Sequence, residues 1–184
     1  MLVILSDIHL GDGTCGKSVS ADAFQVFAER LKEMAMRASW RADGTYRPIK
    51  EITILLLGDI LDPLHSTRWL DTQPEDPNYT RPWTDQSSPA YAEKVREITR
   101  AILDKNAAST RALRDLDVAI PRDLRTRLGW MRKRRIVKVK TNIYYMIGNH
   151  DWYYGIIGEA FNAIRAEIVE AFGLAQDSSP FPHV

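Results

Sequence analysis

The sequence predicts an α/β fold in which buried parallel strands alternate with helices. Three short apolar runs have the composition of buried strands, at residues 2–5, 52–57 and 136–147, and each ends in a polar cluster. A helical pattern separates the first two runs, which is the strand, helix, strand order of a parallel crossover. The 184 residues have the length of one ordinary domain.

The composition is that of a globular protein without a dominant charge. The 25 Lys and Arg residues nearly balance the 24 Asp and Glu residues, which argues against a stable nucleic-acid complex. No apolar run approaches the roughly 20 residues that span a bilayer, and the apolar start lacks the basic segment of a signal peptide. Cys15 is the only cysteine, which excludes an internal disulfide and suits a reducing compartment. We therefore expect a cytoplasmic protein without a transmembrane segment.

One helix is predicted between the first two strands, and another is predicted after the third strand. Ser20 is placed to cap the first helix. Its apolar positions recur at intervals of three and four residues, at Phe24, Phe27, Leu31 and Met34. A last helix is expected at about residues 156–172, with Gly173 as its C-cap.

A long insertion separates the second and third strands. Several prolines make its first part a loop or a flexible cover. Ser88 followed by Pro89 is typical of a helix start, and the apolar stripe of that helix continues towards Pro121. The stripe contains Val95, Ile98, Ile102 and Leu113. A second helix is expected up to Arg134, so that residues 63–135 form a helical hairpin inserted in a single domain.

The polar clusters after the strands contain the residues suited to chemistry. They are Asp7-Ile8-His9, Gly58-Asp59-Ile60-Leu61-Asp62 and Gly148-Asn149-His150-Asp151. An open α/β sheet binds its ligands at the carboxyl ends of its strands, so the clusters are expected to meet there. Alternation along an extended chain would direct Asp7 and His9 to one ion, and Asp59 could bridge two ions. Mixed Asp, His and Asn ligands suit Mn²⁺, Fe or Zn²⁺ better than Ca²⁺.

The third cluster joins a neutral ligand to a group that can transfer protons. Asn149 offers an amide oxygen to a metal, and Asp151 is placed to orient the ring of His150. Asp62 is expected either to support the site from behind its ligands or to cap the following segment. His65 is expected to be a loop residue.

In their order along the chain, the motifs D-x-H, GDxxD and GNHD resemble the N-terminal motifs of the calcineurin-like metallophosphoesterase family. The residues Ser6-Asp7-Ile8-His9-Leu10-Gly11 are similar to the opening of that family, and the resemblance covers about residues 1–152. It implies the N-terminal part of a four-layer α/β/β/α sandwich with a helical insertion. The implied activity is hydrolysis of phosphate monoesters, diesters or anhydrides at a two-metal centre.

The resemblance also implies a role for each residue. Asp7 and His9 would hold the first ion, Asp59 would bridge both ions, and Asn149 would hold the second. His150, assisted by Asp151, would protonate the leaving oxygen. The implied metal is Mn²⁺, with Fe or Zn²⁺ as alternatives. The implied substrates are phosphorylated small molecules, nucleotides or lipid precursors, and the inserted cap resembles the enzymes that cleave UDP-diacylglucosamine.

The later motifs of that family are missing from this sequence. The family completes its site with a later histidine at a strand end and with a G-H-x-H pair, which this chain lacks. His183 is expected to lie in a loop and is a doubtful ligand. The second ion would then have too few protein ligands. We therefore expect an incomplete domain over residues 1–184, which a C-terminal polypeptide would complete.

Two alternative functions stay open. The sequence Gly11-Asp12-Gly13-Thr14-Cys15-Gly16-Lys17-Ser18 satisfies the G-x-x-x-x-G-K-[ST] pattern, which is typical of a P-loop NTPase. Against this alternative, the metal-ligand residues separate the pattern from its strand, and the third cluster would have no function. On the phosphoesterase interpretation, Lys17 is a loop residue. The other alternative is a module that binds metal or phosphate without catalysis.

Aromatic and basic residues lie near these motifs. The aromatic residues that flank the third cluster are Tyr144, Tyr145, Trp152, Tyr153 and Tyr154. Packing in the core is their expected role, with stacking on a substrate as the alternative. The basic run at residues 132–135 is expected to be a solvated helix face, with a grip on an anionic substrate as the alternative.

Overall fold

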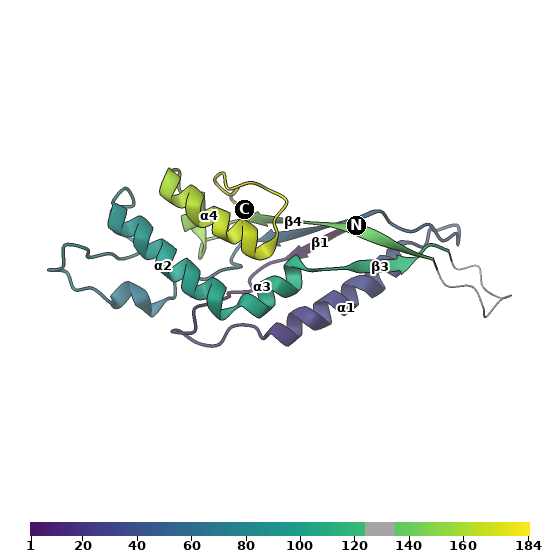
Figure 1. The fold of residues 1–184 in the computed structure, drawn as a ribbon, viewed down its shortest axis with the longest axis horizontal. Helices are drawn as coiled ribbons and strands as arrows, with labels where there is room; N and C mark the ends of the chain where they lie inside the picture. The colour runs from purple at the N-terminus through teal and green to yellow at the C-terminus, as the bar shows by residue number, and fades with distance from the viewer. Residues whose placement is uncertain (124–134) are drawn as a thin grey trace.

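The computed structural model describes residues 1–123 and 135–184 as a mixed α/β fold (Figure 1). Its four-stranded sheet has the order β1-β2-β4-β3. The strands are Leu2–Leu5 (β1), Glu51–Leu57 (β2), Val118–Pro121 (β3) and Ile136–Met146 (β4). β1, β2 and β4 run parallel, with Val3 opposite Ile54 and Ile54 opposite Ile143. The three predicted strands and their parallel pairing are therefore confirmed.

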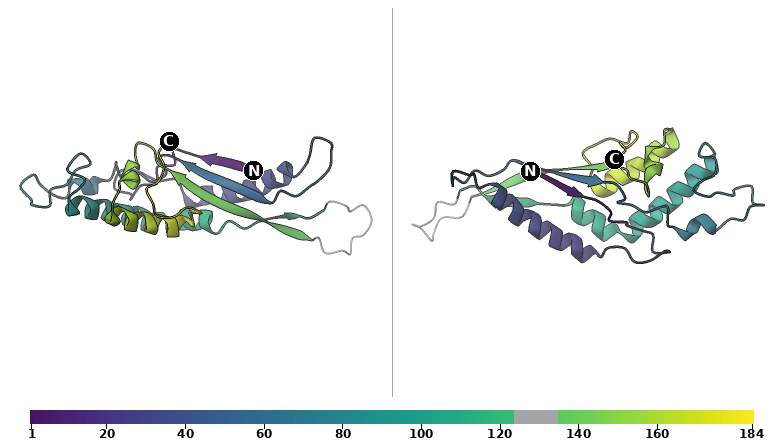
Figure 2. Two further views of the ribbon diagram at one scale, coloured as in Figure 1. Left: turned by 90° about the horizontal axis from the view of Figure 1, so that it is seen from above. Right: turned by 180° about the vertical axis from the view of Figure 1, so that it is seen from behind.

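A layer of helices lies on one face of this sheet and continues beyond the end of the strands (Figure 1). They are Ala21–Ala38 (α1), Pro89–Lys105 (α2), Ala107–Arg114 (α3) and Glu159–Phe172 (α4), with short 3₁₀ helices at Thr67–Leu70 (η1) and Trp152–Gly155 (η2). α3 contacts α1 and α4, and α2 contacts α4, so the helices form one continuous layer (Figure 2). Side chains on one face of the central strands, including Ile54, Leu56 and Tyr145, are fully buried. Among the described residues, no helix is both long enough and apolar enough to cross a bilayer.

The ends of two helices agree with the signals in the sequence. The Ser88 hydroxyl accepts a hydrogen bond from Tyr91 N at 3.2 Å, and Pro89 is the first residue of α2. Gly173 follows α4 with φ 63°, in the left-handed conformation that favours glycine. The predicted start of α2 and the predicted end of α4 are therefore confirmed.

The first helix differs in detail from its prediction. Ser20 precedes α1, but its side chain makes no capping hydrogen bond. The buried positions are Phe24, Leu31 and Ala35, whereas Met34 is 43% exposed. The helical period of 3.6 residues explains this shift, because a residue four positions after Leu31 lies closer to the buried face than a residue three positions after it.

The insertion contributes a strand as well as helices. The helical pattern breaks at Asn106 and ends at Arg114, so the predicted helix towards Pro121 is wrong beyond that point. β3 pairs antiparallel with the start of β4 and alternates between buried and half-buried side chains. This segment forms a strand because its backbone groups pair with those of β4, which comes later in the sequence. The second helix predicted up to Arg134, and most of the basic run at residues 132–135, lie outside the described residues.

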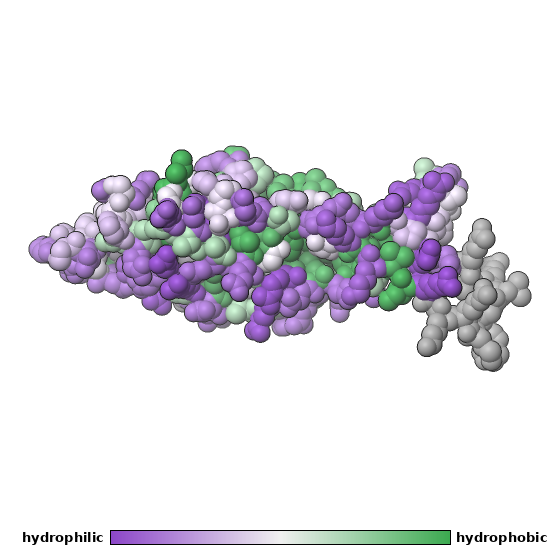
Figure 3. All heavy atoms as spheres, turned by 45° about the horizontal axis from the view of Figure 1, so that its top comes forward, coloured by the Kyte–Doolittle hydropathy of each residue, from purple (hydrophilic) through white to green (hydrophobic). Residues whose placement is uncertain are grey.

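The opposite face of the sheet carries exposed apolar side chains. Leu2 and Ile4 of β1 are 60% and 51% exposed, and Tyr144 of β4 is 38% exposed. In Figure 3 hydrophobic surface gathers over the middle of the molecule, where the sheet lies.

Candidate metal centre

The three polar clusters meet at one end of the sheet, as the parallel strands predicted. Donor atoms of Asp7, His9 and Asp59 lie within 4.8 Å of one another. Backbone hydrogen bonds join the first cluster to the second, from Asp7 N to Gly58 O at 3.2 Å and from His9 N to Asp59 O at 2.9 Å. The third cluster is joined through His150 N, which donates to Asp59 Oδ1 at 2.9 Å. The arrangement is therefore held by the backbone.

The three residues with converging donor atoms share an unusual backbone conformation. Asp7, His9 and Asp59 have φ angles of 54°, 50° and 55°, and no other non-glycine residue in the described part of the chain has a positive φ. Such a conformation costs of order 1–3 kcal/mol per residue and persists only where the surroundings impose it. This differs from the extended chain on which the sequence prediction relied. Asp7, His9 and Asp59 converge as predicted, but left-handed turns bring them together. Asn149, the fourth predicted ligand, lines a neighbouring cavity with Asp7 and Asp59.

A cavity of about 400 Å³ adjoins this cluster. Its lining includes Asp7, Asp59, Asn149 and His183. Ile147 N donates to Pro182 O at 2.8 Å, and Val184 N donates to Ile147 O at 3.0 Å, so the end of the chain runs parallel beside Ile147. The sequence analysis placed His183 in a loop as a doubtful ligand. The pairing with Ile147 instead brings its side chain to the same cavity as Asn149.

Asp62 is the centre of a cluster of three histidine rings. Its Oδ2 lies 3.2 Å from His9 Nδ1 and 2.8 Å from His65 Nδ1, and its Oδ1 lies 3.2 Å from His150 Nδ1. Burial opposes ionisation of Asp62, but the hydrogen bonds from His65 and His150 outweigh it, so the pKa of Asp62 is below its ordinary value. Asp62 is therefore a carboxylate. Its Oδ1 also accepts a hydrogen bond from His65 N at 3.2 Å, so Asp62 contacts both the predicted ligand His9 and the segment that follows it.

His65 lies in a turn, as expected, and its ring also joins this cluster, with 4.8 Å between its centroid and that of His150. The sequence analysis did not predict that contact. The available signal was the D-P-L-H spacing, because an Asp and the residue three positions later face each other across a turn. That signal alone is weak, since the same spacing occurs in ordinary surface turns.

Asp151 has a different position from the predicted one. Its side chain is fully buried and accepts hydrogen bonds from Gly148 N at 2.6 Å, Ile60 N at 3.1 Å and Tyr145 Oη at 2.7 Å. Burial raises the pKa of Asp151, although these hydrogen bonds oppose the shift. The expectation that Asp151 orients His150 is corrected, because Asp62 contacts that ring. Asp151 directly precedes η2, with φ −118° and ψ 18°, and its carboxyl group faces the core.

The aromatic residues beside the third cluster divide between the core and the surface. Tyr145, Tyr153 and Tyr154 are fully buried, which confirms the expected core packing for these three. Tyr153 stacks on Trp69, with 5.6 Å between ring centroids. Tyr144 lies on the exposed face of the sheet and does not belong to the core.

Hydrogen bonds join the two ends of the loop at residues 11–18, which matches a phosphate-binding pattern. Ser18 Oγ accepts a hydrogen bond from Gly11 N at 2.9 Å and donates to Gly11 O at 3.3 Å. α1 begins only at Ala21, after the Lys17 and Ser18 positions. In a P-loop, the Ser hydroxyl faces Mg²⁺ and the backbone amides of the loop surround phosphates. The geometry at Ser18 differs from that arrangement.

Gly148 allows the close approach of the second and third clusters. A Cβ at this position would lie 2.9 Å from Asp59 Cγ and 3.0 Å from Asp59 N. We expect Gly148→Ala to displace the Asp59 carboxylate and to weaken Mn²⁺ binding about 10- to 100-fold, as loss of ligand support typically does. Calorimetric titration with Mn²⁺ measures the change. Gly11→Ala is the control, because its Cβ would make only ordinary contacts, and equal affinities in the two variants would contradict the prediction.

Comparisons with protein-family models and with curated proteins find no match for this chain. The resemblance to metallophosphoesterases therefore depends on the three motifs in the sequence. The donor atoms of Asp7, His9 and Asp59 lie close enough together to hold a metal ion.

Proposed function

We propose that this protein is a metal-dependent phosphoesterase of the metallophosphoesterase type, and that it hydrolyses a phosphate ester or anhydride. One observation carries the proposal. Asp7, His9 and Asp59, which the motifs single out as ligands, are also the only non-glycine residues with positive φ in the described part of the chain. Backbone strain of this kind clusters at functional sites, where the fold has to hold it.

The donor set fits one divalent ion well and a second ion in part. Asp7, His9 and Asp59 would hold the first ion, and Asp59 and Asn149 would hold the second, with His183 lining the same cavity. Oxygen and imidazole donors together suit Mn²⁺, which is the metal we propose, with Fe or Zn²⁺ as alternatives. Two such ions supply Lewis acidity and a nucleophile at neutral pH.

A second group of donor atoms, from His9, Asp62 and His150, could also hold an ion. The hydrogen bonds favour the first group. Both carboxylate oxygens of Asp62 already accept hydrogen bonds, from three rings and from the His65 backbone. In contrast, His9 can keep its Nδ1 on Asp62 and offer Nε2 to a metal, which is the usual way that a ligating histidine is oriented.

His150 is the proposed general acid. Its Nδ1 lies 3.2 Å from Asp62 Oδ1, which leaves Nε2 for the leaving oxygen of the substrate. The ionised Asp62 stabilises the imidazolium that has to donate this proton. The side chain of His150 is partly exposed, and Asp59 holds its backbone N–H.

The test of the proposed function is hydrolysis of bis(p-nitrophenyl) phosphate by the purified protein with added Mn²⁺. We expect turnover that EDTA abolishes and that Mn²⁺ restores, because the acidic ligands require a cation. Metal content should be measured on the same sample by atomic emission. Bound metal without turnover would support a binding module instead, and neither metal nor turnover would overturn the proposal.

A further inference from the structure

A second cavity lies next to the proposed metal centre. It has a volume of about 380 Å³ and lies between the loop before α1 and the junction of α2 with α3. Its lining includes Gly13, Lys17, Ser18, Lys105, Asn106 and Ser109. Lys17 and Ser18 also line a smaller cavity that contains His9, Asp62 and His65. The larger cavity therefore shares a wall with the histidine cluster, and its volume is in the range of small-molecule sites.

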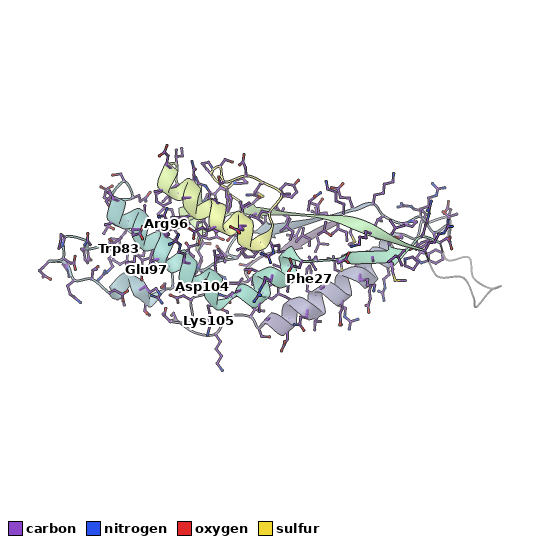
Figure 4. All side chains as sticks on the ribbon, viewed as in Figure 1. Phe27, Trp83, Arg96, Glu97, Asp104 and Lys105 are labelled. Atoms are coloured by element: carbon purple, nitrogen blue, oxygen red, sulfur yellow. The ribbon has the colours of Figure 1, made fainter. Side chains whose placement is uncertain are left out.

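Two lysines bring positive charge to this cavity. Lys105 is the last residue of α2 (Figure 4), and its side chain lies over Gly13, where a Cβ would come within 3.2 Å of Lys105 Cε. Lys94 and Lys138 pair with carboxylates. Among the described residues, no carboxylate forms an ion pair with Lys17 or Lys105. Their charges are therefore available to an anionic ligand.

Hydrogen bonds hold the two walls of the cavity together. Asn106 is buried at the α2–α3 junction, and its Nδ2 donates to Gly11 O at 2.8 Å and to Ile102 O at 2.7 Å. Ser18 is bound to Gly11 from the other side of the loop. The carboxylate of Asp12 in this loop accepts hydrogen bonds from Ser66 Oγ at 2.6 Å and from Arg68 Nε at 3.2 Å. The cavity is thus formed before a ligand binds, which lowers the entropic cost of binding.

We propose that this cavity is a second phosphate subsite, which binds the distal phosphate of a diphosphate substrate while its reacting phosphate lies at the metal centre. The substrate assignment rests on the proposed function. Water adds its oxygen to the reacting phosphorus, and the anhydride P–O bond breaks. The leaving phosphate keeps the electron pair of that bond and takes a proton from His150. A proton released by the attacking water then reprotonates His150. Lys17 and Lys105 stabilise the charge that develops on the leaving phosphate.

Binding of ADP to the EDTA-treated protein tests the subsite without any dependence on catalysis. Lys17→Ala and Lys105→Ala should each raise the Kd for ADP about tenfold in calorimetry, as loss of a charge-assisted contact does. Both side chains are exposed, so the variants should fold. Lys32→Ala is the matched control, because Lys32 is an exposed lysine of α1 outside the cavity lining, and its Kd should match that of the parent.

The outcomes separate the subsite from the proposed function. Unchanged ADP binding in both lysine variants would overturn the subsite, even if bis(p-nitrophenyl) phosphate is hydrolysed. ADP binding that depends on both lysines, in a protein without divalent-dependent hydrolysis, would support the anion site and overturn the phosphoesterase. Binding that requires Mg²⁺ and depends on Lys17 alone would indicate the P-loop NTPase and would overturn the subsite.

Discussion

Asp59→Asn should remove more metal than any other single substitution in the pocket and should abolish hydrolysis. Asp59 is nearly buried, and its carboxylate is the group that we propose to bridge the two ions. An amide carries no charge to balance a cation, so we expect the affinity for Mn²⁺ to fall by more than about 100-fold. Metal content after dialysis and the rate with bis(p-nitrophenyl) phosphate measure the two effects.

His150→Ala is the counterpart of that substitution. In the proposed mechanism its ring donates a proton and does not hold either ion, so metal content should be unchanged. The value of kcat should fall by about 10²- to 10⁴-fold, which is the usual contribution of a general acid. The fall should be smaller for a substrate whose leaving group needs no proton. Equal metal loss in the Asp59 and His150 variants would contradict this separation of roles.

Asp151→Ala should cause the largest loss of stability in the region. The substitution leaves three donors without their acceptor, namely Gly148 N, Ile60 N and Tyr145 Oη. Unpaired buried polar groups are costly, so we expect the free energy of unfolding to fall by about 3–5 kcal/mol. Tyr145→Phe removes one of these contacts together with the hydrogen bond from Leu61 N, and should cost about 1–3 kcal/mol. Urea unfolding of the metal-free proteins measures both, and similar losses in the two variants would contradict the assignment.

The contribution of Asp151 should also depend on pH. Burial raises the pKa of its carboxyl group in the folded protein above the value in the unfolded chain. A raised pKa means that the folded state binds the proton more tightly, so this contribution is fully present below the unfolded pKa of about 4. It is lost as the pH rises through the folded pKa. The difference in unfolding free energy between the parent and Asp151→Ala should therefore shrink from acid towards neutral pH, and a difference that grows would be contrary to the assignment.

Local patterns in the sequence determined the strands and the candidate ligands of this protein. Apolar runs identified β1, β2 and β4, because the composition of a strand that is buried in a parallel sheet is visible within a few residues. The same runs located Asp7, His9 and Asp59, since parallel strands place their carboxyl ends together. Helix starts and ends, such as Ser88 and Gly173, were visible for the same local reason.

Only the tertiary structure decided which partner each polar group has. Asp62 lies 53 residues from His9 and 88 residues from His150, and Asp151 lies 91 residues from Ile60. Sequence patterns show whether a side chain is buried, but they do not show which distant atom it meets. The left-handed turns, the β3 strand and the position of His183 likewise depend on pairing with segments far along the chain. Their energy comes from long-range hydrogen bonds and packing, which exist only once the sheet has formed.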